Sequence, residues 1–305
     1  MKRRFYTLDV FTEQRFCGNP LAVVIDGDGL GDAAMQTIAR EFNLSETVFV
    51  SAPRNPIHSA AVRIFTPASE LPFAGHPTVG TGVLLAHLKA RDHMAAPGGV
   101  VIALEEKIGL VNVEVSVRPG RAARGVFTLP RLPEPVDWQP DASAIAAALG
   151  VDPLDIGFAA HAPCAWSAGV PFVMVPLRGL AAVAQAAPGD AATWHAAFGA
   201  VGRGAVFLYT RETQKPEHHV HARMFAPKLG VTEDPATGSA AAAFAGPAVL
   251  FERPEDGLHQ IIIEQGYEMG RPSEIVLDLD VQHGRLAGAR IGGGAVIVSE
   301  GTIEA

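Results

Sequence analysis

An ordered series of short motifs occurs twice along this chain, and this internal repeat constrains the fold more than any other feature of the sequence. Each copy runs from a Gly-x-Pro turn, through a Gly-Asp-Ala-Ala segment, a Val-Phe pair and an Arg-x-Phe-x-Pro segment, to a Glu-x-Pro-x-x-Gly turn. The paired segments are 18–20 with 169–171, 31–34 with 189–192, 48–49 with 206–207, 63–67 with 223–227, and 70–75 with 233–238. The spacing between partners drifts only as loop insertions would make it drift, so we interpret the halves as one fold duplicated.

Each half also carries the local signals of short strands, helices and a hairpin. Residues 100–105 and 110–117 flank Lys107-Ile108-Gly109 and predict a hairpin, and local hairpins imply a largely antiparallel sheet. Small residues at 78–82 and 240–243 follow the two Glu-x-Pro-x-x-Gly turns, which suits helices enclosed by a sheet. The predicted fold class is therefore α+β, with two pseudo-symmetric domains, each a mostly antiparallel sheet wrapped around a central helix.

The domain boundary is expected at a proline-rich segment, residues 130–140, which we interpret as a linker. The predicted domains are 1–130 and 131–305, and the C-terminal strands can pack across this boundary. Asp32 and Asp141 are each expected to cap a helix, the first running to about Phe42 and the second ending at Gly150. Further short strands are expected at 8–11 and 295–299.

Composition narrows the class of partner. Hydrophobic residues make up 48% of the chain and charged residues 18%, as in a globular protein. The net charge of −8 and the lack of a basic stripe argue against a nucleic-acid partner. The most apolar run, 240–251, is too short to span a bilayer, no export signal is visible, and Cys17 and Cys164 make no disulfide framework. We therefore expect a cytoplasmic protein that acts on a small molecule, with no membrane partner.

The two Glu-x-Pro-x-x-Gly turns are the candidate binding sites. Each places a polar side chain at a helix start, where unpaired backbone N–H groups and the helix dipole favour an anionic ligand. Two such turns facing one another would make a pocket for a small acid.

Positions at which the halves differ are the better candidates for chemistry, because shared positions such as the Arg63–Arg223 and Glu70–Glu233 pairs are expected to serve the fold. The differing pairs are His76 with Ser239, Leu71 with Asp234, Ala74 with Thr237, and Glu46 with Gly204. The polar candidates are thus Glu46, His76, Asp234 and Ser239. Each candidate also has a purely structural alternative. Glu46 could be a solvated turn residue, His76 and Ser239 could cap helices, and Asp234 could be an ordinary turn former.

Signals for a metal or a cofactor are weak. His219 and His221 would share one strand face, but no further ligand cluster lies near them in sequence. Gly292-Gly293-Gly294 is followed by a strand pattern and not by the helix that a phosphate-binding loop needs. We predict neither a metal site nor a cofactor.

The motifs as a set resemble the PhzF-like phenazine-biosynthesis isomerase family, over essentially the whole chain. The motifs that carry the resemblance are residues 18–23, 45–47, 72–78, 223–227 and 233–240. The resemblance implies a diaminopimelate-epimerase-like fold and a cofactor-independent isomerase that moves a proton on a small carboxylic acid by general acid/base catalysis. The founding activity is that of a trans-2,3-dihydro-3-hydroxyanthranilate isomerase. A homodimer is implied as well.

The resemblance also assigns roles to single residues. Glu46 matches the family's general acid/base. The implied catalytic set is Glu46, His76, Asp234 and Ser239, and the implied substrate-binding set is Gly75, Pro77, Thr237 and Gly238.

Two alternatives stay open. The same fold hosts racemases and epimerases that use two cysteines, but this chain has Ala74 and Thr237 where those cysteines would stand. A one-base racemase or epimerase of an amino or hydroxy acid, acting through Glu46, is compatible with the sequence. So is a binding protein for a small acid that has lost catalysis.

Overall fold

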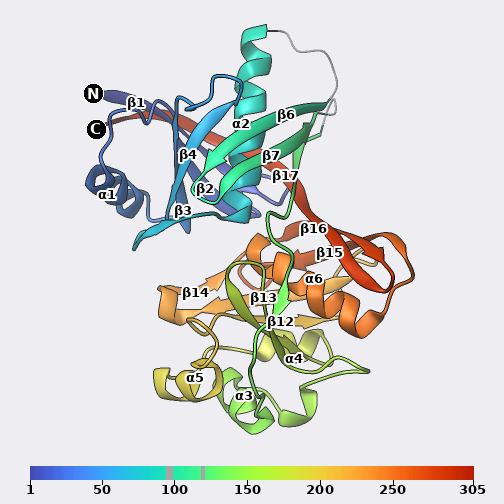
Figure 1. Ribbon diagram of the computed structural model, residues 1–305. Helices are drawn as coiled ribbons and strands as arrows, with labels where there is room; N and C mark the ends of the chain where they lie inside the picture. Colours follow the sequence, from blue (N-terminus) through green and yellow to red (C-terminus); the bar gives the residue numbers. More distant parts are fainter. Residues whose placement is uncertain (94–98, 118–120) are drawn as a thin grey trace. The chain divides into compact units, whose positions relative to one another are not determined.

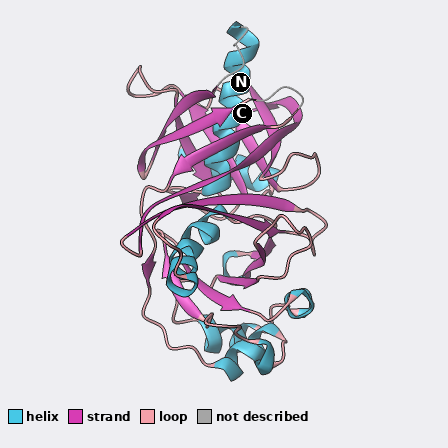
Figure 2. Cartoon of the chain, turned by 90° about the vertical axis from the view of Figure 1, so that its right-hand side faces the viewer, coloured by secondary structure: helices cyan, strands magenta, loops and turns pink. Residues whose placement is uncertain are grey.

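The computed structural model describes residues 1–93, 99–117 and 121–305 and divides into two compact units (Figure 1). Unit 1 comprises Met1–Pro130 and Gly292–Ala305, and unit 2 comprises Arg131–Ile291. Both are mixed α/β structures in which strands predominate and helices are few, as the colours of Figure 2 show. Among the described residues, no helix combines the length and the apolar character that crossing a bilayer requires.

Unit 1 is a mixed sheet that packs on one long helix. Its strands are β1 (Lys2–Val10), β2 (Asn19–Val24), β3 (Glu46–Ser51), β4 (Ala60–Phe65), β5 (Glu70–Leu71), β6 (Gly99–Glu106), β7 (Gly109–Ser116) and β8 (Ala123–Thr128), and its helices are α1 (Asp32–Phe42) and α2 (Gly75–His93). The pairs β1–β2, β3–β4, β4–β5, β6–β7 and β7–β8 are antiparallel, whereas β2–β3 and β4–β6 are parallel. The hairpin expected around residue 108 is confirmed as β6–β7.

Unit 2 repeats this pairing scheme and adds helices. Its strands are β9 (Glu134–Pro135), β10 (Cys164–Ser167), β11 (Pro171–Pro176), β12 (Val206–Thr210), β13 (Val220–Ala226), β14 (Val231–Asp234), β15 (Gly257–Gln265) and β16 (Ser273–Gln282); its helices are α3 (Ala142–Leu149), α4 (Leu180–Gln185), α5 (Ala191–Phe198) and α6 (Gly238–Glu252), with short 3₁₀ turns at Pro153–Asp155 and Pro227–Leu229. The pairs β10–β11, β12–β13, β13–β14 and β15–β16 are antiparallel, and β11–β12 and β13–β15 are parallel. The order of parallel and antiparallel neighbours is therefore the same as from β1 to β7.

The last strand, β17 (Arg285–Glu304), is divided between the two units, its first part belonging to unit 2 and its second part to unit 1. Residues up to Ile291 belong to unit 2, and residues from Gly292 onward belong to unit 1, where β17 pairs antiparallel with β1 along almost the whole of that strand. The strand signals at 8–11 and 295–299 thus underestimated both strands. The three glycines at 292–294 lie within β17.

Glycines let α2 lie close against the sheet of unit 1. Figure 1 shows α2 beside β6 and β7, and the helix also packs on β1, β2, β3 and β8. A Cβ atom at Gly80 would stand 2.6 Å from the end of the Leu21 side chain, and one at Gly82 would stand 2.8 Å from Val113. Small residues at these positions are therefore required by packing.

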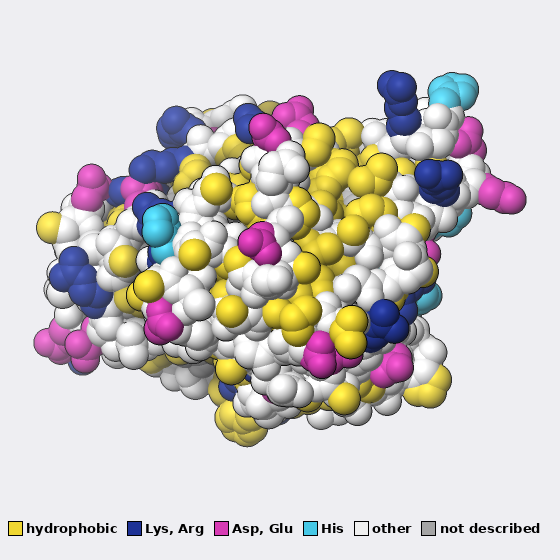
Figure 3. All heavy atoms as spheres, turned by 90° about the horizontal axis from the view of Figure 1, so that it is seen from below, with side chains coloured by type: hydrophobic (Ala, Val, Ile, Leu, Met, Phe, Trp, Pro, Cys, Tyr) yellow, Lys and Arg dark blue, Asp and Glu magenta, His cyan; other side chains and the backbone are white. Residues whose placement is uncertain are grey.

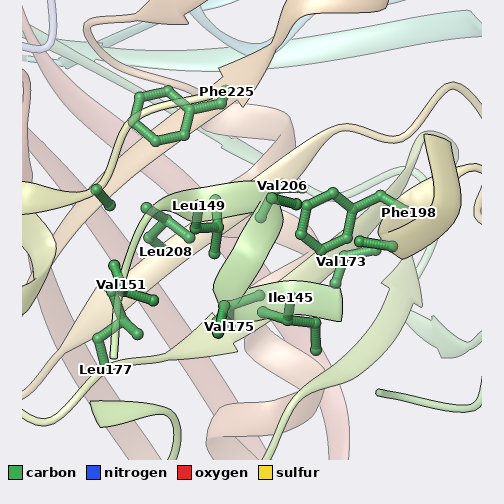
Figure 4. Close-up of a cluster of buried hydrophobic side chains, with 14 of the residues drawn as sticks. Ile145, Leu149, Val151, Val173, Val175, Leu177, Phe198, Val206, Leu208 and Phe225 are labelled. Atoms are coloured by element: carbon green, nitrogen blue, oxygen red, sulfur yellow. The ribbon is translucent and has the colours of Figure 1, made fainter. Parts of the chain in front are cut away.

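In unit 2 the alanine-rich helix α6 is buried from Ala240 to Val249, and its Gly246 faces the ring of Trp166. A separate apolar cluster lies between the strands β11 and β12 and the helices α3 and α5 (Figure 4). It includes Val173, Val175, Val206, Leu208, Ile145, Leu149 and Phe198. Figure 3, which views the chain from below, shows hydrophobic side chains gathered over the middle of this face and charged side chains mostly toward its edge.

A side-chain cap explains where α3 begins, but not where α1 begins. The prediction for α3 is confirmed, because the Asp141 carboxylate accepts hydrogen bonds from the N–H groups of Ser143 and Ala144, and Gly150 ends the helix at a φ of 67°. The prediction that Asp32 caps α1 is wrong. Gly31 occupies the cap position, and the Asp32 carboxylate instead accepts a hydrogen bond of 2.7 Å from Arg63.

Candidate functional site

The turns that open α2 and α6 are each anchored by an arginine–glutamate pair. In unit 1, Arg63 of β4 donates from Nε and Nη2 to the two carboxylate oxygens of Glu70, at 2.7 and 2.8 Å. In unit 2, Arg223 of β13 donates to Glu233 in the same way, at 2.8 and 2.9 Å. Such two-pronged pairs fix both distance and orientation. The pair with Arg63 lowers the pKa of Glu70, so that carboxyl group is ionised at neutral pH.

Glu46 and His76 come together in unit 1. Glu46 is the first residue of β3, pairs with Leu21 of the parallel neighbour β2, and has a side chain that is only 16% exposed. His76 is the second residue of α2 and is buried. Its Nε2 atom lies 3.3 Å from Oε2 of Glu46. The strand β3 and the helix start thus bring two residues that the sequence singled out to within contact distance.

His76 is a neutral imidazole in this position. Burial lowers its pKa from 6.5 to about 3, because removing the ring from water disfavours its charged form. The contact with Glu46 is therefore not a pairing of two full charges at neutral pH. A neutral imidazole can donate a hydrogen bond from Nε2 to an ionised carboxylate, or accept one from a protonated carboxyl group. Among the described residues His76 Nε2 makes no hydrogen bond, so the two groups lie close together without being bonded.

In unit 2 the side chains around Asp234 form a closed hydrogen-bond network. The Thr237 hydroxyl donates to Asp234 Oδ2 at 2.5 Å, and the amide nitrogen of Gln265, at the end of β15, donates to the carbonyl of Asp234 at 2.6 Å and to Thr237 Oγ1 at 3.1 Å. The backbone N–H of Thr237 donates to Gln265 Oε1 at 3.0 Å. The network holds the turn before α6 in one conformation.

The start of α6 lacks a side-chain cap. Thr237 occupies the cap position, but its side chain makes no capping hydrogen bond and is engaged with Asp234. Gly238 and the half-buried Ser239 are the first two residues of the helix. Backbone N–H groups at an uncapped helix start favour an anionic group such as a carboxylate. At the other turn, Gly75 and Pro77 lie in the first turn of α2 and are buried.

Sequence reasoning missed the acidic ends of β6 and β15. Glu105 is the acceptor for the N–H groups of Arg54 and Asn55, at 3.0 and 2.9 Å, and lies 2.8 Å from His58 Nδ1. Glu264 accepts in the same manner from the N–H groups of Gln214 and Lys215, and lies 2.6 Å from His218 Nδ1. The next residue is Glu106 in one unit and Gln265 in the other. The matching Glu-Glu and Glu-Gln dipeptides were the available signal.

The histidines that were weighed as metal ligands have other partners. The two ring nitrogens of His221 lie 2.7 and 2.9 Å from carboxylate oxygens of Glu264 and Glu268. Burial alone would lower the pKa of His221, but the two carboxylates outweigh it and raise the pKa to about 9. Within residues 1–93, 99–117 and 121–305, no group of three or more His, Cys, Asp or Glu residues is arranged to hold a metal ion.

The cysteines are poorly suited to proton transfer. Cys17 and Cys164 form no disulfide in the part of the chain that the structure describes. Burial raises the pKa of the Cys164 thiol to about 12, so its reactive thiolate form is scarce at neutral pH. Ala74 and Thr237, at the two turns, carry no thiol.

Comparison with known proteins defines the class. An uncharacterized isomerase of Mesorhizobium japonicum is 50% identical over 99% of both chains, and a trans-2,3-dihydro-3-hydroxyanthranilate isomerase of Pseudomonas chlororaphis is 33% identical over 98% of both. The crystal structure of a PhzF-family phenazine biosynthesis protein of Bacillus anthracis matches the full length of both chains with a TM-score of 0.87 at 24% identity. The protein is an enzyme of the isomerase class.

The family follows from the sequence profile described as "Phenazine biosynthesis-like protein", which matches residues 8–301. The chain belongs to this family, known as PhzF, as the resemblance in the motifs had predicted.

Proposed function

We propose that the protein is a cofactor-independent isomerase that moves a proton on a small carboxylic acid, with Glu46 as the general acid/base. The observation that carries the proposal is the Glu46 carboxyl group, partly buried at the start of β3 and 3.3 Å from a neutral His76. The Pseudomonas chlororaphis relative is named for isomerisation of trans-2,3-dihydro-3-hydroxyanthranilate, which makes this acid the first substrate to test.

The proposed reaction needs a base at carbon and a way to return the proton. Glu46 takes a proton from a C–H bond of the substrate, and the electron pair of that bond becomes part of a shifted double bond. The Glu46 carboxyl group, whose proton exchanges with solvent, then delivers a proton to another carbon of the substrate. Substrate and product therefore have the same atoms and charge. His76, whose Nε2 atom lies 3.3 Å from Glu46 Oε2, can form a hydrogen bond to the carboxyl group in either protonation state during the reaction. Keeping His76 neutral avoids a fixed ion pair that would hold Glu46 in its ionised form.

Developing negative charge on the substrate needs stabilisation as well. Backbone N–H groups at a helix start supply such stabilisation without reorganisation, and the family motif has one helix start in each half of the sequence, at α2 and at α6. The proposed roles of Asp234 and Ser239, as groups that hold the polar end of the substrate, rest on the family motif and on the closed network around Asp234.

We infer further that the two units are copies of one fold, each with a helix against its sheet, in the diaminopimelate-epimerase-like arrangement. Three independent features support this: the five repeated motifs, the same order of parallel and antiparallel strand pairs, and the matching Arg–Glu and His–Glu contacts. In this interpretation residues that the copies share form the frame, and residues that differ, such as Glu46 and His76, carry the chemistry.

Proton NMR of dihydro-3-hydroxyanthranilate in D₂O tests the proposal. Wild type should introduce deuterium into the ring as the starting diene disappears. Glu46→Gln should lower the rate by about 10³-fold, within the range that general acid/base groups contribute. Glu41→Gln, which changes an exposed glutamate of α1, is the matched control and should behave as wild type. If Glu46→Gln keeps most of the wild-type rate, Glu46 is not the general acid/base. If wild type does not convert this acid, the substrate is another small acid.

A further inference from the structure

A second carboxyl group is buried beside the candidate site in unit 1. Glu106 is the last residue of β6 and is only 3% exposed. Its Oε1 atom lies 2.7 Å from the hydroxyl oxygen of Thr78, in a buried contact. Thr78 belongs to the first turn of α2, two residues after His76. Glu106 therefore contacts the segment that carries His76, and the mechanism above does not use it.

The hydrogen bonds of Thr78 place a proton on Glu106. The Thr78 hydroxyl oxygen lies 2.8 Å from the carbonyl oxygen of Ala74 and 2.7 Å from Glu106 Oε1. A hydroxyl has one hydrogen to donate, whereas a backbone carbonyl can only accept. If Thr78 donates to Ala74, the contact with Glu106 is a hydrogen bond only when Glu106 donates. Both short contacts are satisfied when Glu106 is a protonated carboxylic acid.

The other oxygen of Glu106 supports the same protonation state. In the part of the chain that the structure describes, Oε2 of Glu106 is buried and has no hydrogen-bond partner. An ionised carboxylate there would leave charge on an unsolvated atom, which costs far more than leaving a neutral carbonyl oxygen unpaired. Burial accordingly raises the pKa of Glu106 to about 8, although the hydrogen bond from Thr78 acts in the opposite direction.

Charged neighbours do not offset this burial. Ionisable groups on the surrounding elements are engaged elsewhere: Glu105 with Arg54 and His58, Lys107 with Glu70, Arg63 with Glu70 and Asp32, and His76 with Glu46. Among the described residues, no charged side chain contributes to the pKa shift of Glu106, and its side-chain contact is with the hydroxyl of Thr78.

Unit 2 shows what this position requires. Gln265 ends β15 as Glu106 ends β6, and each follows a glutamate that binds a loop and a histidine. The Gln265 amide donates to the hydroxyl of Thr237 at 3.1 Å, and Thr237 then donates to Asp234. An amide nitrogen donates at every pH. A protonated Glu106 would donate to Thr78 in the same direction, and Thr78 would donate to Ala74.

We infer that Glu106 is a neutral carboxylic acid that donates its proton to Thr78, and that it thereby positions the first turn of α2 and the His76 ring. Glu106 is a positioning residue and not a catalytic one. Its consequence for turnover rests on the proposed function of Glu46 and His76, whereas its protonation state does not.

Infrared difference spectra of wild type and Glu106→Gln, recorded without substrate, test the protonation state. At about pH 6, between the ordinary glutamate value of 4.5 and the raised value of about 8, wild type should show the carbonyl band of one protonated carboxyl group that the variant lacks. The band should disappear as the pH rises above about 8. Absence of the band at about pH 6 would overturn the inference.

Kinetics of three variants test the positioning. Glu106→Gln keeps a donor toward Thr78, as Gln265 does toward Thr237, and should keep kcat within about threefold. Glu106→Leu and Thr78→Val remove the donor and the hydroxyl, and kcat should fall by about 10- to 100-fold with little change in KM, as for a small misplacement of a catalytic group. Circular dichroism establishes that each variant is folded. Equal kcat values for Glu106→Gln and Glu106→Leu would overturn the positioning role.

NMR of the His76 ring separates this inference from the proposed function. The ring nitrogen signals, assigned with His76→Gln, should move in Glu106→Leu and Thr78→Val and stay in place in Glu106→Gln. This readout needs no substrate. If the infrared band and the ring shifts are found while wild type turns over no tested acid, only the proposed reaction fails. If the ring signals are the same in all three variants, Glu106 does not position His76.

Discussion

The turn that opens α2 in unit 1 and the turn that opens α6 in unit 2 are each held by an arginine–glutamate pair. The residue at the strand end that contacts each turn differs, however. A titratable acid, Glu106, supports the first turn, and an amide, Gln265, supports the second. The first turn carries His76 beside Glu46, and the second carries Asp234 bound to Thr237. The comparison teaches that the two units share the arginine–glutamate frame, whereas the polar side chains at their turns differ. The residue that supports the turn is therefore expected to respond to pH in unit 1 but not in unit 2.

The largest expected effect comes from breaking the shared frame. Arg223 has a side chain that is 9% exposed and also donates to the carbonyls of Val183 and Ala186, whereas the Arg63 side chain is 29% exposed. Arg223→Ala leaves Glu233 as an unpaired, mostly buried charge and should lower the free energy of unfolding by about 3–5 kcal/mol. Arg63→Ala should cost less, because Lys107 remains beside Glu70 and the Arg63 side chain is itself more exposed. Urea denaturation of both variants measures the difference, and a larger loss for Arg63→Ala would contradict the comparison.

A smaller effect is expected at the glycines of the two helices. A Cβ at Gly246 of α6 would stand 2.2 Å from the Trp166 ring, whereas a Cβ at Gly80 of α2 would stand 2.6 Å from the end of the Leu21 side chain and 2.7 Å from a methyl group of Val10. Gly246→Ala should therefore destabilise the protein by about 3 kcal/mol, at the upper end for overpacking. Gly80→Ala should cost less, about 1–2 kcal/mol, because two side-chain ends can shift more easily than a ring and the gain in helix propensity offsets part of the clash. Thermal unfolding compares the two variants, and equal losses would show that the Trp166 ring moves as easily as Leu21.

The pH dependence of stability gives two smaller effects of opposite sign in unit 1. The pKa of His76 is lowered to about 3 in the folded protein, so the unfolded chain binds the proton more tightly, and stability falls as the pH drops from about 6.5 toward 3. Each pH unit in this window costs at most about 1.4 kcal/mol. His76→Gln removes the titrating ring and should show a shallower fall. Urea denaturation across this pH range measures the slope, and identical slopes would mean that His76 is charged in the folded protein.

Glu106 should act in the opposite direction. Its folded pKa is raised to about 8 from 4.5, so the folded protein binds the proton more tightly, and stability falls as the pH rises from about 4.5 to 8. Relative to Glu106→Gln, wild type should lose at most about 1.4 kcal/mol per pH unit in this window. Gln265→Leu serves as the control in unit 2, because it removes no titrating group and should leave the slope unchanged. A wild-type slope equal to that of Glu106→Gln would show that Glu106 is ionised throughout.

Local signals in the sequence predicted the parts of the fold that depend on neighbouring residues. The helix between Asp141 and Gly150 and the hairpin around residue 108 were predictable because a cap and a tight turn involve residues a few positions apart. Asp32 misled the same reasoning, because Arg63, a residue far away in sequence, takes its carboxylate. Strands β1 and β17 are longer than their apolar patterns indicated, because each is completed by the other.

The polar residues of the candidate site were predictable from the sequence, but the residues that hold the two turns in place, Glu106 and Gln265, were not. Glu46 and His76 stood out because the second copy has Gly204 and Ser239 in their places. Glu106 and Gln265 lie at strand ends, where matching Glu-Glu and Glu-Gln dipeptides are a weak signal, and their importance depends on burial and on a threonine from another element. Burial and hydrogen-bond direction at such positions are tertiary properties, so no local pattern reveals them.

The pairing of β17 with β1 has a consequence for how the protein is made. Strand β1 leaves the ribosome long before residues 295–304, which pair with one of its edges. Until those residues emerge, unit 1 presents an open strand edge, whereas unit 2 needs nothing beyond Ile291. During synthesis the second unit can therefore finish folding before the first, and the exposed edge of β1 is the segment that a chaperone would protect in the meantime.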